Sequence, residues 1–266
     1  MDAYVVDAFT STAFCGNPAG VVVLDAPADP AWMQAVAAEF KHAETAFVVA
    51  DGSEGADGGE PKSLRWFTPT TEVDLCGHAT LATAYILGGS QRFDTRSGTL
   101  NCTSTGDGIV EMDFPSVTSQ PVRAPEELTT ALPGVTVESV ARGDFDLLVQ
   151  VASAAEVRAL RPDLDTLARI PTRAVIVTAP GDREGVDVVS RVFAPRVGIG
   201  EDPVTGSAHC ALASWWSAAL GRTAESTELI GEQASPRGGL VRMTLHGSRV
   251  GLAGRAVTIL RGELLA

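Results

Sequence analysis

Two glycines, Gly77 and Gly206, stand at the start of apolar segments where a helix end could bind an anion. Gly77 precedes the small apolar residues 79–87, and Gly206 precedes a second apolar segment at 207–220. Both segments are typical of helices that are buried on nearly all sides. The first N–H groups of a helix have no intrahelical partner, and the helix dipole adds a partial positive charge. The sequence therefore predicts two sites that could hold a carboxylate or a developing enolate without lysine or arginine.

A titratable residue lies close to each predicted helix start. His78 directly follows Gly77, and Asp202 lies four residues before Gly206. A helix N-terminus keeps a histidine neutral, because the dipole opposes its positive charge, and it stabilises an aspartate as the anion. Each residue also has a plain structural interpretation, His78 as a hydrogen-bonded histidine at a helix cap and Asp202 as an acid of the preceding loop. From the residues alone, both interpretations stay open.

Glu44 is the third candidate for acid/base chemistry. The sequence places it between a helix that ends near Phe40 and an apolar strand at 47–50. In a pocket, a carboxylate among apolar residues has a raised pKa and can act as a general acid/base. At a loop it faces solvent, and this second interpretation is the commoner one for a glutamate.

The elements that must position these residues are short strands and a few helices. Apolar runs bounded by turn residues predict strands, and apolar residues at helical spacing predict helices. The predicted strands lie at residues 4–9, 21–24, 47–50, 64–67, 109–114, 147–151, 174–178, 188–193, 240–245, 250–252 and 257–260. The predicted helices lie at residues 30–40, 79–87, 154–160, 164–170 and 207–220. Residues 51–60 are acidic and almost without apolar side chains, which predicts an exposed loop.

The two halves of the chain repeat one pattern. Arg-Trp-Phe-Thr-Pro at 65–69, a loop and Gly-His-Ala at 77–79 match Arg-Val-Phe-Ala-Pro at 191–195, a loop and Gly-Ser-Ala at 206–208. A predicted buried helix follows in both halves. An offset of about half the chain is too long for a solenoid repeat. It indicates two similar domains, each with its sheet wrapped around one central apolar helix.

The fold class expected from this pattern is α+β, with two pseudo-symmetric domains built on mostly antiparallel sheets. The boundary is expected near 116–123, where prolines follow a predicted strand. The N-terminal domain would then comprise residues 1–117, completed by the C-terminal strand 256–266, and the second domain would comprise residues 118–255.

The charge balance limits the possible partners. With 20 basic and 33 acidic residues the net charge is −13, so nucleic acid and an anionic membrane surface would be repelled. We expect no membrane span, because no apolar segment is long enough, and a cytoplasmic protein, because the N-terminus lacks the basic segment of a secretory signal. The four cysteines and four histidines form no cluster with zinc-ligand spacing, so we expect reduced thiols and no metal site.

Several short motifs follow one another along nearly the whole chain. They are Gly-Asn-Pro-Ala at 16–19, His-Ala-Glu-Thr-Ala-Phe-Val at 42–48, Cys-Gly-His-Ala-Thr at 76–80, Phe-Asp-Thr-Arg-Ser-Gly at 93–98, Glu-Asp-Pro-Val-Thr-Gly-Ser-Ala-His at 201–209 and Gln-Ala-Ser-Pro-Arg-Gly-Gly at 233–239. Together they resemble the PhzF-like phenazine-biosynthesis family. The resemblance implies a diaminopimelate epimerase-like fold and a cofactor-free isomerase, whose type reaction is the isomerisation of trans-2,3-dihydro-3-hydroxyanthranilate. A small anionic, carboxylate-bearing substrate and a homodimer are the partners that we expect.

The resemblance also implies roles for individual residues. Glu44 matches the glutamate that moves a proton, and His78 and Asp202 match the catalytic histidine and aspartate. The amides of two glycines would face the substrate in a cleft shared by the domains. The substrate-binding residues implied in this way are Gly77, Gly206 and Ser207, with Cys76 beside them.

Cys76 keeps other functions open. Two-base epimerases and racemases of the same fold use one cysteine at each central helix start. Cys76 occupies the first such place, whereas Pro203-Val204-Thr205 stands at the second and Cys210 comes inside the predicted helix. Cys76 is then either a packed thiol beside the site or a lone nucleophile or base. The alternatives to a Glu44-dependent isomerase are an amino-acid epimerase or racemase that uses Cys76 and a non-enzymatic protein that binds a metabolite.

Overall fold

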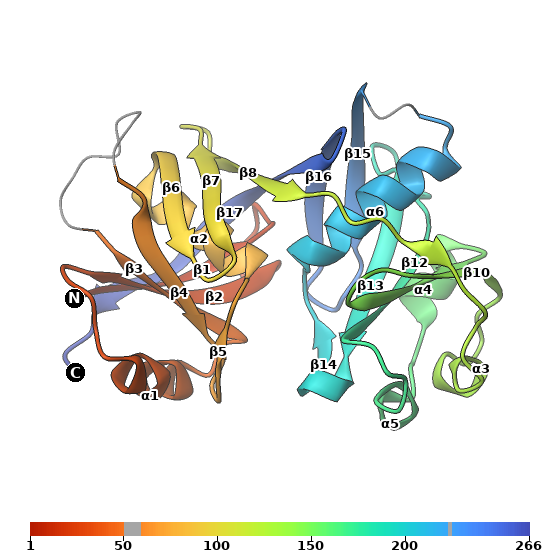
Figure 1. Ribbon diagram of the computed structural model, residues 1–266, viewed down its shortest axis with the longest axis horizontal. Coiled ribbons are helices and arrows are strands. Elements are labelled where there is room, and N and C mark those ends of the chain that lie inside the picture. The colour runs from red at the N-terminus through yellow and green to blue at the C-terminus, as the bar shows by residue number, and fades with distance from the viewer. Residues whose placement is uncertain (51–59, 223–224) are drawn as a thin grey trace. The chain divides into compact units, whose positions relative to one another are not determined.

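The computed structural model describes residues 1–50, 60–222 and 225–266 (Figure 1). Except for Glu60, the loop expected at 51–60 lies outside the described residues. The chain forms two compact units, one of Met1–Asp113 with Ala253–Ala266 and one of Phe114–Leu252. The C-terminal segment thus returns to the first unit. No helix in the described part of the chain combines the length and the apolar character needed to cross a bilayer.

The first unit consists of strands and two helices. Its strands are β1 (Asp2–Ala8), β2 (Asn17–Leu24), β3 (Glu44–Val49), β4 (Lys62–Phe67), β5 (Glu72–Val73), β6 (Gly89–Thr95), β7 (Gly98–Ser104), β8 (Ile109–Pro115) and β17 (Arg249–Glu263), and its helices are α1 (Pro30–Phe40) and α2 (Gly77–Leu87). Strands β8 and β17 both run across the boundary between the units.

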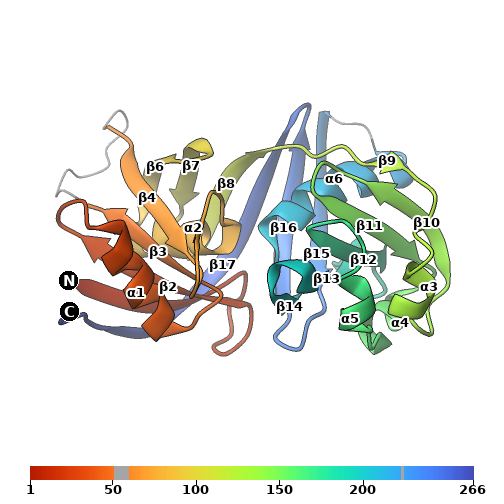
Figure 2. The ribbon, with the colours of Figure 1, turned by 60° about the horizontal axis from the view of Figure 1, so that its bottom comes forward.

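Helix α2 is the centre of the first unit because its side chains are small. It contacts β1, β2, β3, β6 and β7, and both views show it among these strands (Figures 1 and 2). All seven residues from His78 to Ala84 are buried. Helix α1 lies elsewhere, on β3 and β4, where Met33 and Val36 join a core with Phe47 and Phe67. Small residues on every face therefore allow strands to surround α2, whereas α1 buries one face only.

The second unit has its own helices and strands. Its strands are β9 (Gln120–Pro121), β10 (Val137–Arg142), β11 (Asp146–Val151), β12 (Ala174–Pro180), β13 (Val188–Ala194), β14 (Ile199–Asp202), β15 (Glu225–Gln233) and β16 (Gly239–His246), and its helices are α3 (Leu128–Ala131), α4 (Ala154–Ala159), α5 (Leu164–Leu167), the 3₁₀ helix η1 (Pro195–Val197) and α6 (Gly206–Ala219). Helix α6 contacts β15 and β16, and the indole N–H of Trp216 donates to the Thr178 hydroxyl of β12 at 3.0 Å.

The two units repeat the same order of strand pairings. In the first unit, β1–β2 is antiparallel, β2–β3 parallel, β3–β4 antiparallel, β4–β6 parallel and β6–β7 antiparallel. In the second unit, β10–β11 is antiparallel, β11–β12 parallel, β12–β13 antiparallel, β13–β15 parallel and β15–β16 antiparallel. Helices α2 and α6 occupy equivalent places, after the short strands β5 and β14. The predicted α+β class with two pseudo-symmetric halves is confirmed.

One prediction about the strands is wrong. The sequence predicted separate strands at 250–252 and 257–260, but β17 is one continuous strand. Gly254, between the two predicted strands, marks close packing rather than a break. A Cβ there would lie 2.5 Å from Cδ1 of Phe9 and 3.4 Å from Cδ1 of Leu81, so the bare backbone makes room for both side chains.

Candidate active site

Glu44 is the first residue of β3, not a loop residue as the sequence suggested. Its backbone pairs in parallel register with Ala19 of β2. Helix α1 has already ended at Lys41, which adopts a left-handed conformation with φ 56°. The strand begins earlier than its apolar run because Thr45 and Ala46 are both fully buried. The Glu44 side chain is 13% exposed and is therefore held among other groups rather than in open solvent.

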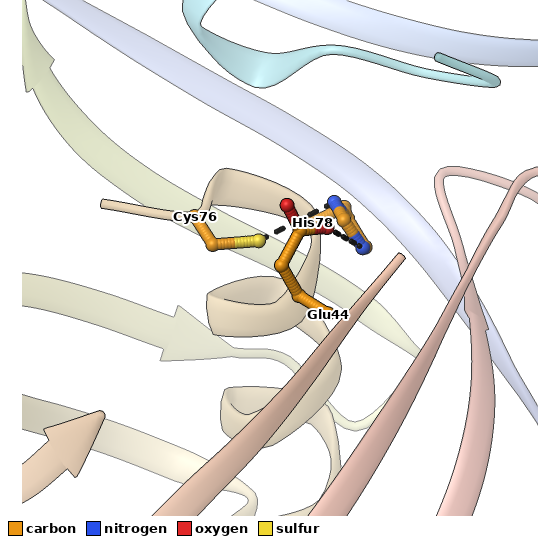
Figure 3. Close-up of side chains that lie close together, drawn as sticks. All are labelled: Glu44, Cys76 and His78. Carbon is orange, nitrogen blue, oxygen red and sulfur yellow. Dashed lines mark hydrogen bonds and ion pairs between the residues drawn. The ribbon is translucent and has the colours of Figure 1, made fainter. Parts of the chain in front are cut away.

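The structure brings Glu44 next to His78, on the first turn of α2. Oε2 of Glu44 lies 3.5 Å from Nε2 of His78, whose side chain is 6% exposed (Figure 3). Nε2 makes no hydrogen bond to the described residues. Burial lowers the pKa of His78 to about 3, and the charge of His42 contributes in the same direction. His78 is therefore neutral at physiological pH, as the position at a helix start predicts.

Cys76 completes this cluster at the other ring nitrogen of His78. It is the N-cap residue of α2, and its Sγ lies 3.5 Å from Nδ1 of His78 (Figure 3). One ligand atom from each of Glu44, Cys76 and His78 lies within 4.8 Å of the others. Cys76 and His78 lie at one helix start, whereas Glu44 comes from a strand more than thirty positions earlier in the sequence. Such a cluster can move protons or hold a cation.

Strong contacts fix the segment that leads into α2. Arg65 of β4 donates to Glu72 through Nε at 2.7 Å and through Nη2 at 2.8 Å. The hydrogen bonds from Arg65 hold the pKa of Glu72 below its usual value. Glu72 also pairs with Arg96 at 2.6 Å, and the Arg65 guanidinium lies 5.3 Å from the centre of the Phe67 ring. The first copy of the repeated Arg-x-Phe motif thus anchors the segment before Cys76.

Asp202, the last residue of β14, is held by the turn that leads into α6. The Thr205 hydroxyl donates to the Asp202 carboxylate. The buried Gln233 accepts from the Thr205 backbone N–H at 2.9 Å and donates to the Asp202 carbonyl at 2.7 Å. The sequence analysis assigned no separate role to Gln233. Its amide spans both ends of this turn and so fixes the approach to Gly206.

Ser207, on the first turn of α6, is in contact with a cation that the sequence did not indicate. Nη2 of Arg173 donates to Oγ of Ser207 at 3.0 Å. Arg173 also forms a two-armed ion pair with Asp146, with Nε to Oδ1 at 2.8 Å. A cation therefore lies beside the second helix start, where the sequence analysis considered the backbone N–H groups alone. Arg173 stands alone before an apolar strand, so no local pattern connects it with Ser207.

The site residues fall into two groups, each within its own unit. Glu44, Cys76 and His78, with Gly77 between the last two, gather at the start of α2. The second group, Asp202, Gly206 and Ser207, gathers at the start of α6. That both groups face one substrate stays a prediction.

Comparisons with known proteins find relatives over nearly the whole chain. The chain matches the family model PhzC-PhzF, described as phenazine biosynthesis-like protein, over residues 6–262. It is 46% identical over 275 residues to an uncharacterized isomerase of Halalkalibacterium halodurans, in a match that covers 98% of this chain and 97% of the relative. Among solved structures, a phenazine biosynthesis protein of the PhzF family from Enterococcus faecalis is 37% identical, with a TM-score of 0.90 and coverage of 100% and 99%. A probable proline racemase from Agrobacterium radiobacter K84 shares the fold at 11% identity, with a TM-score of 0.63 and coverage of 99% and 92%.

Proposed function

The chain belongs to the PhzC-PhzF family of phenazine biosynthesis-like proteins and is an isomerase, and from this premise we propose that Glu44 moves a proton on a small carboxylate-bearing substrate. The reaction needs no cofactor in this proposal. The family indicates the class of reaction but not the substrate, because substrate specificity depends on the residues that line each site.

The observation that carries the proposal is the contact between Glu44 and His78. A mostly buried carboxyl lies 3.5 Å from the imidazole of a buried, neutral histidine. A general acid/base must bind and release a proton, and bulk water must be largely excluded from it. The 13% exposure of the Glu44 side chain is compatible with both requirements. Glu44 would take a proton from one carbon and return it to another.

The start of α2 supplies what such a proton transfer needs. Removal of a proton next to a carboxylate or carbonyl places negative charge on oxygen. The backbone N–H groups of Gly77 and His78 belong to the first turn of α2 and support binding of that charge. Because His78 is neutral, it can form a hydrogen bond with the reacting group as donor or as acceptor. It adds no positive charge, which would keep Glu44 in the anionic form.

The second group would bind the remainder of the substrate in this proposal. Asp202 offers an anionic acceptor for an amino or hydroxyl group, and Ser207 offers a hydroxyl next to the guanidinium of Arg173. The first-turn N–H groups of α6, beginning at Gly206, favour a carboxylate. A substrate with one carboxylate and one hydrogen-bond donor fits these groups.

The test is deuterium exchange in a Glu44→Gln variant. The wild-type enzyme is incubated in D₂O with trans-2,3-dihydro-3-hydroxyanthranilate and with a set of amino and hydroxy acids, and deuterium at carbon is followed by NMR. We expect exchange to fall by about 10²–10⁴-fold in the variant, the usual contribution of a general acid/base. Glu39→Gln, at an exposed glutamate of α1, is the matched control and should exchange at the wild-type rate. Exchange by Glu44→Gln at the wild-type rate would remove Glu44 from the mechanism.

A second candidate function rests on Cys76. Its Sγ lies 3.5 Å from Nδ1 of His78 at the N-cap of a helix, a position that favours a thiolate. In an amino-acid epimerase, this thiolate would remove the α-proton of an amino acid, and a second acid on the opposite face would return a proton with inversion at the α-carbon. Alkylation that stops turnover, together with protection by the substrate, would favour this function. A Cys76→Ser variant with full activity would exclude it, and binding of a substrate without any exchange would indicate a metabolite-binding protein instead.

A further inference from the structure

The cluster at the start of α2 contains three kinds of side chain that together bind zinc. A thiol, an imidazole and a carboxylate, from Cys76, His78 and Glu44, each place one ligand atom within 4.8 Å of the other two. We propose that these three residues form a binding site for a single Zn²⁺ ion and that bound Zn²⁺ inhibits the enzyme. The sequence analysis argued against zinc because no ligands recur at a familiar spacing, but the third ligand, Glu44, comes from strand β3, far from α2 in the sequence.

The distances suit this ion with little movement. Zinc bonds to sulfur at about 2.3 Å and to nitrogen or oxygen at about 2.0–2.2 Å, so ligand atoms around a tetrahedral ion lie roughly 3.3–3.7 Å apart. The Cys76 Sγ–His78 Nδ1 distance and the Glu44 Oε2–His78 Nε2 distance are both 3.5 Å. A single ion uses one of the two ring nitrogens, so either the carboxylate or the thiol must move closer to that nitrogen, starting from within 4.8 Å.

Elements of secondary structure hold the ligands in place. Cys76 and His78 are the N-cap and the second residue of α2, and the Cys76 carbonyl accepts from both the backbone N–H and the hydroxyl of Thr80, at 3.1 and 2.6 Å. Glu44 is paired in β3. A site on a helix start and a strand needs little ordering when the ion binds, which favours affinity.

The charges of the cluster also balance. Zinc binds cysteine as the thiolate and histidine as the neutral imidazole. One thiolate, one carboxylate and one imidazole neutralise Zn²⁺. The dipole of α2 disfavours a bare cation at this end but favours both anionic ligands, so the ion enters as part of a neutral complex. Three protein ligands leave the fourth position to a solvent molecule or to an anion such as a carboxylate.

Inhibition follows because the ion occupies the acid/base. A carboxylate bound to zinc cannot take up a proton, so Glu44 would no longer exchange with the substrate. This consequence rests on the proposed function of Glu44, whereas the binding site does not. The two claims can therefore fail separately.

Binding is tested on metal-free enzyme without any substrate. Zn²⁺ is titrated by calorimetry, and Cd²⁺ is titrated as a probe whose bond to a thiolate absorbs in the ultraviolet. We expect one ion per chain, a thiolate absorption band, and competition between the two metals. Cys76→Ser should abolish the band, and Cys76→Ser and His78→Gln should each weaken Zn²⁺ binding at least tenfold. Cys15→Ser, at a partly exposed cysteine of the same unit, is the control and should leave both signals unchanged.

Inhibition is measured as proton exchange by the wild-type enzyme, which should stop once one equivalent of Zn²⁺ has bound; exchange that continues in the zinc-loaded enzyme would overturn this part of the proposal. The outcomes also separate the zinc site from the proposed function. Absence of one-to-one binding, or a band that persists in Cys76→Ser, overturns the zinc site even if Glu44→Gln has lost exchange activity. Conversely, one-to-one binding in an enzyme whose Glu44→Gln variant keeps full exchange would retain the site and reject Glu44 as the base. Thermal unfolding of each variant without metal shows whether it is folded, and Cys76→Ala replaces Cys76→Ser if the serine variant is not.

Discussion

Arg191 and Glu201 form the same two-armed ion pair in the second unit that Arg65 and Glu72 form in the first. Nε of Arg191 lies 2.7 Å from Oε1 of Glu201, and Nη2 lies 2.9 Å from Oε2. The guanidinium also lies 5.0 Å from the centre of the Phe193 ring. Each pair joins a long strand to the segment before a central helix. The repeated Arg-x-Phe motif therefore anchors the segment before each central helix.

We predict that the second pair matters more for stability than the first. Arg191→Met leaves a mostly buried Glu201 without its guanidinium, so the free energy of unfolding should fall by about 3 kcal/mol or more. Arg65→Met should cost less, because Arg65 is more exposed and Glu72 keeps its contact with Arg96. Urea denaturation of both variants measures the difference. Equal losses, or a larger loss in Arg65→Met, would contradict the ranking.

The sequence predicted the parts of the fold that have a local signal. Both central helices are recognisable because nearly every residue in them is small or apolar, and their repetition predicts two similar halves. Strands β6 and β7 were missed because only alternate residues are buried, and some of these are polar, such as Gln91 beside Phe93. Burial of alternate polar residues depends on what covers them, so it leaves no pattern in the chain.

The candidate site was predicted only as far as its residues are neighbours in the sequence. Gly77 and His78 could be predicted because they lie at the start of one helix. Asp202 could be predicted because it lies four residues before Gly206, at the start of the other helix. The contacts of Glu44 with His78 and of Arg173 with Ser207 join residues 34 positions apart. They arise from the pairing of strands and the placement of helices on them, which no spacing rule describes. The resemblance to a family identified Glu44, whereas Arg173 had no such support.

Gly254 should not tolerate a side chain. A Cβ in Gly254→Ala would lie 2.5 Å from the fully buried ring of Phe9, which has no space to retreat. We expect a loss of about 1–3 kcal/mol in the free energy of unfolding, the usual cost of overpacking. Gly262→Ala, on the same strand, is the control, because its nearest neighbour would be Leu260 at 3.8 Å. A double variant with Phe9→Leu should lose less than the sum of the single changes.

The cysteines should react with alkylating reagents in a defined order. Cys15 is partly exposed, whereas Cys102 is 2% exposed, and burial raises the pKa of the Cys102 thiol to about 12. Because only the thiolate is alkylated, iodoacetamide at mildly alkaline pH should modify Cys15 first and leave Cys102 unmodified in the folded protein. Mass spectrometry of digested samples, with a urea-unfolded sample as reference, gives the order. Modification of Cys102 as fast as Cys15 would show that the sheet around it opens readily.

His209 should make the protein less stable in acid. Its Nδ1 lies 2.8 Å from the Thr205 carbonyl and therefore carries the proton, and burial lowers its pKa to about 4. In the unfolded chain the pKa returns to near 6.5, so the unfolded state takes up a proton first as the pH falls. The stabilisation is fully present above pH 6.5 and is lost as the pH falls towards about 4, in total roughly 3 kcal/mol.

A His209→Asn variant isolates this effect from the other titrating groups. Its amide N–H can still donate to the Thr205 carbonyl, but it does not titrate. The free energy of unfolding, measured by urea denaturation between pH 4 and pH 7, should therefore depend less steeply on pH than in the wild type. The difference in slope corresponds to at most one proton taken up on unfolding. His78 keeps its own contribution in both proteins and cancels in the comparison. Parallel curves would mean that His209 takes up its proton at the same pH in the folded and unfolded states, and its buried Nε2 would then need an acceptor that the described residues do not supply.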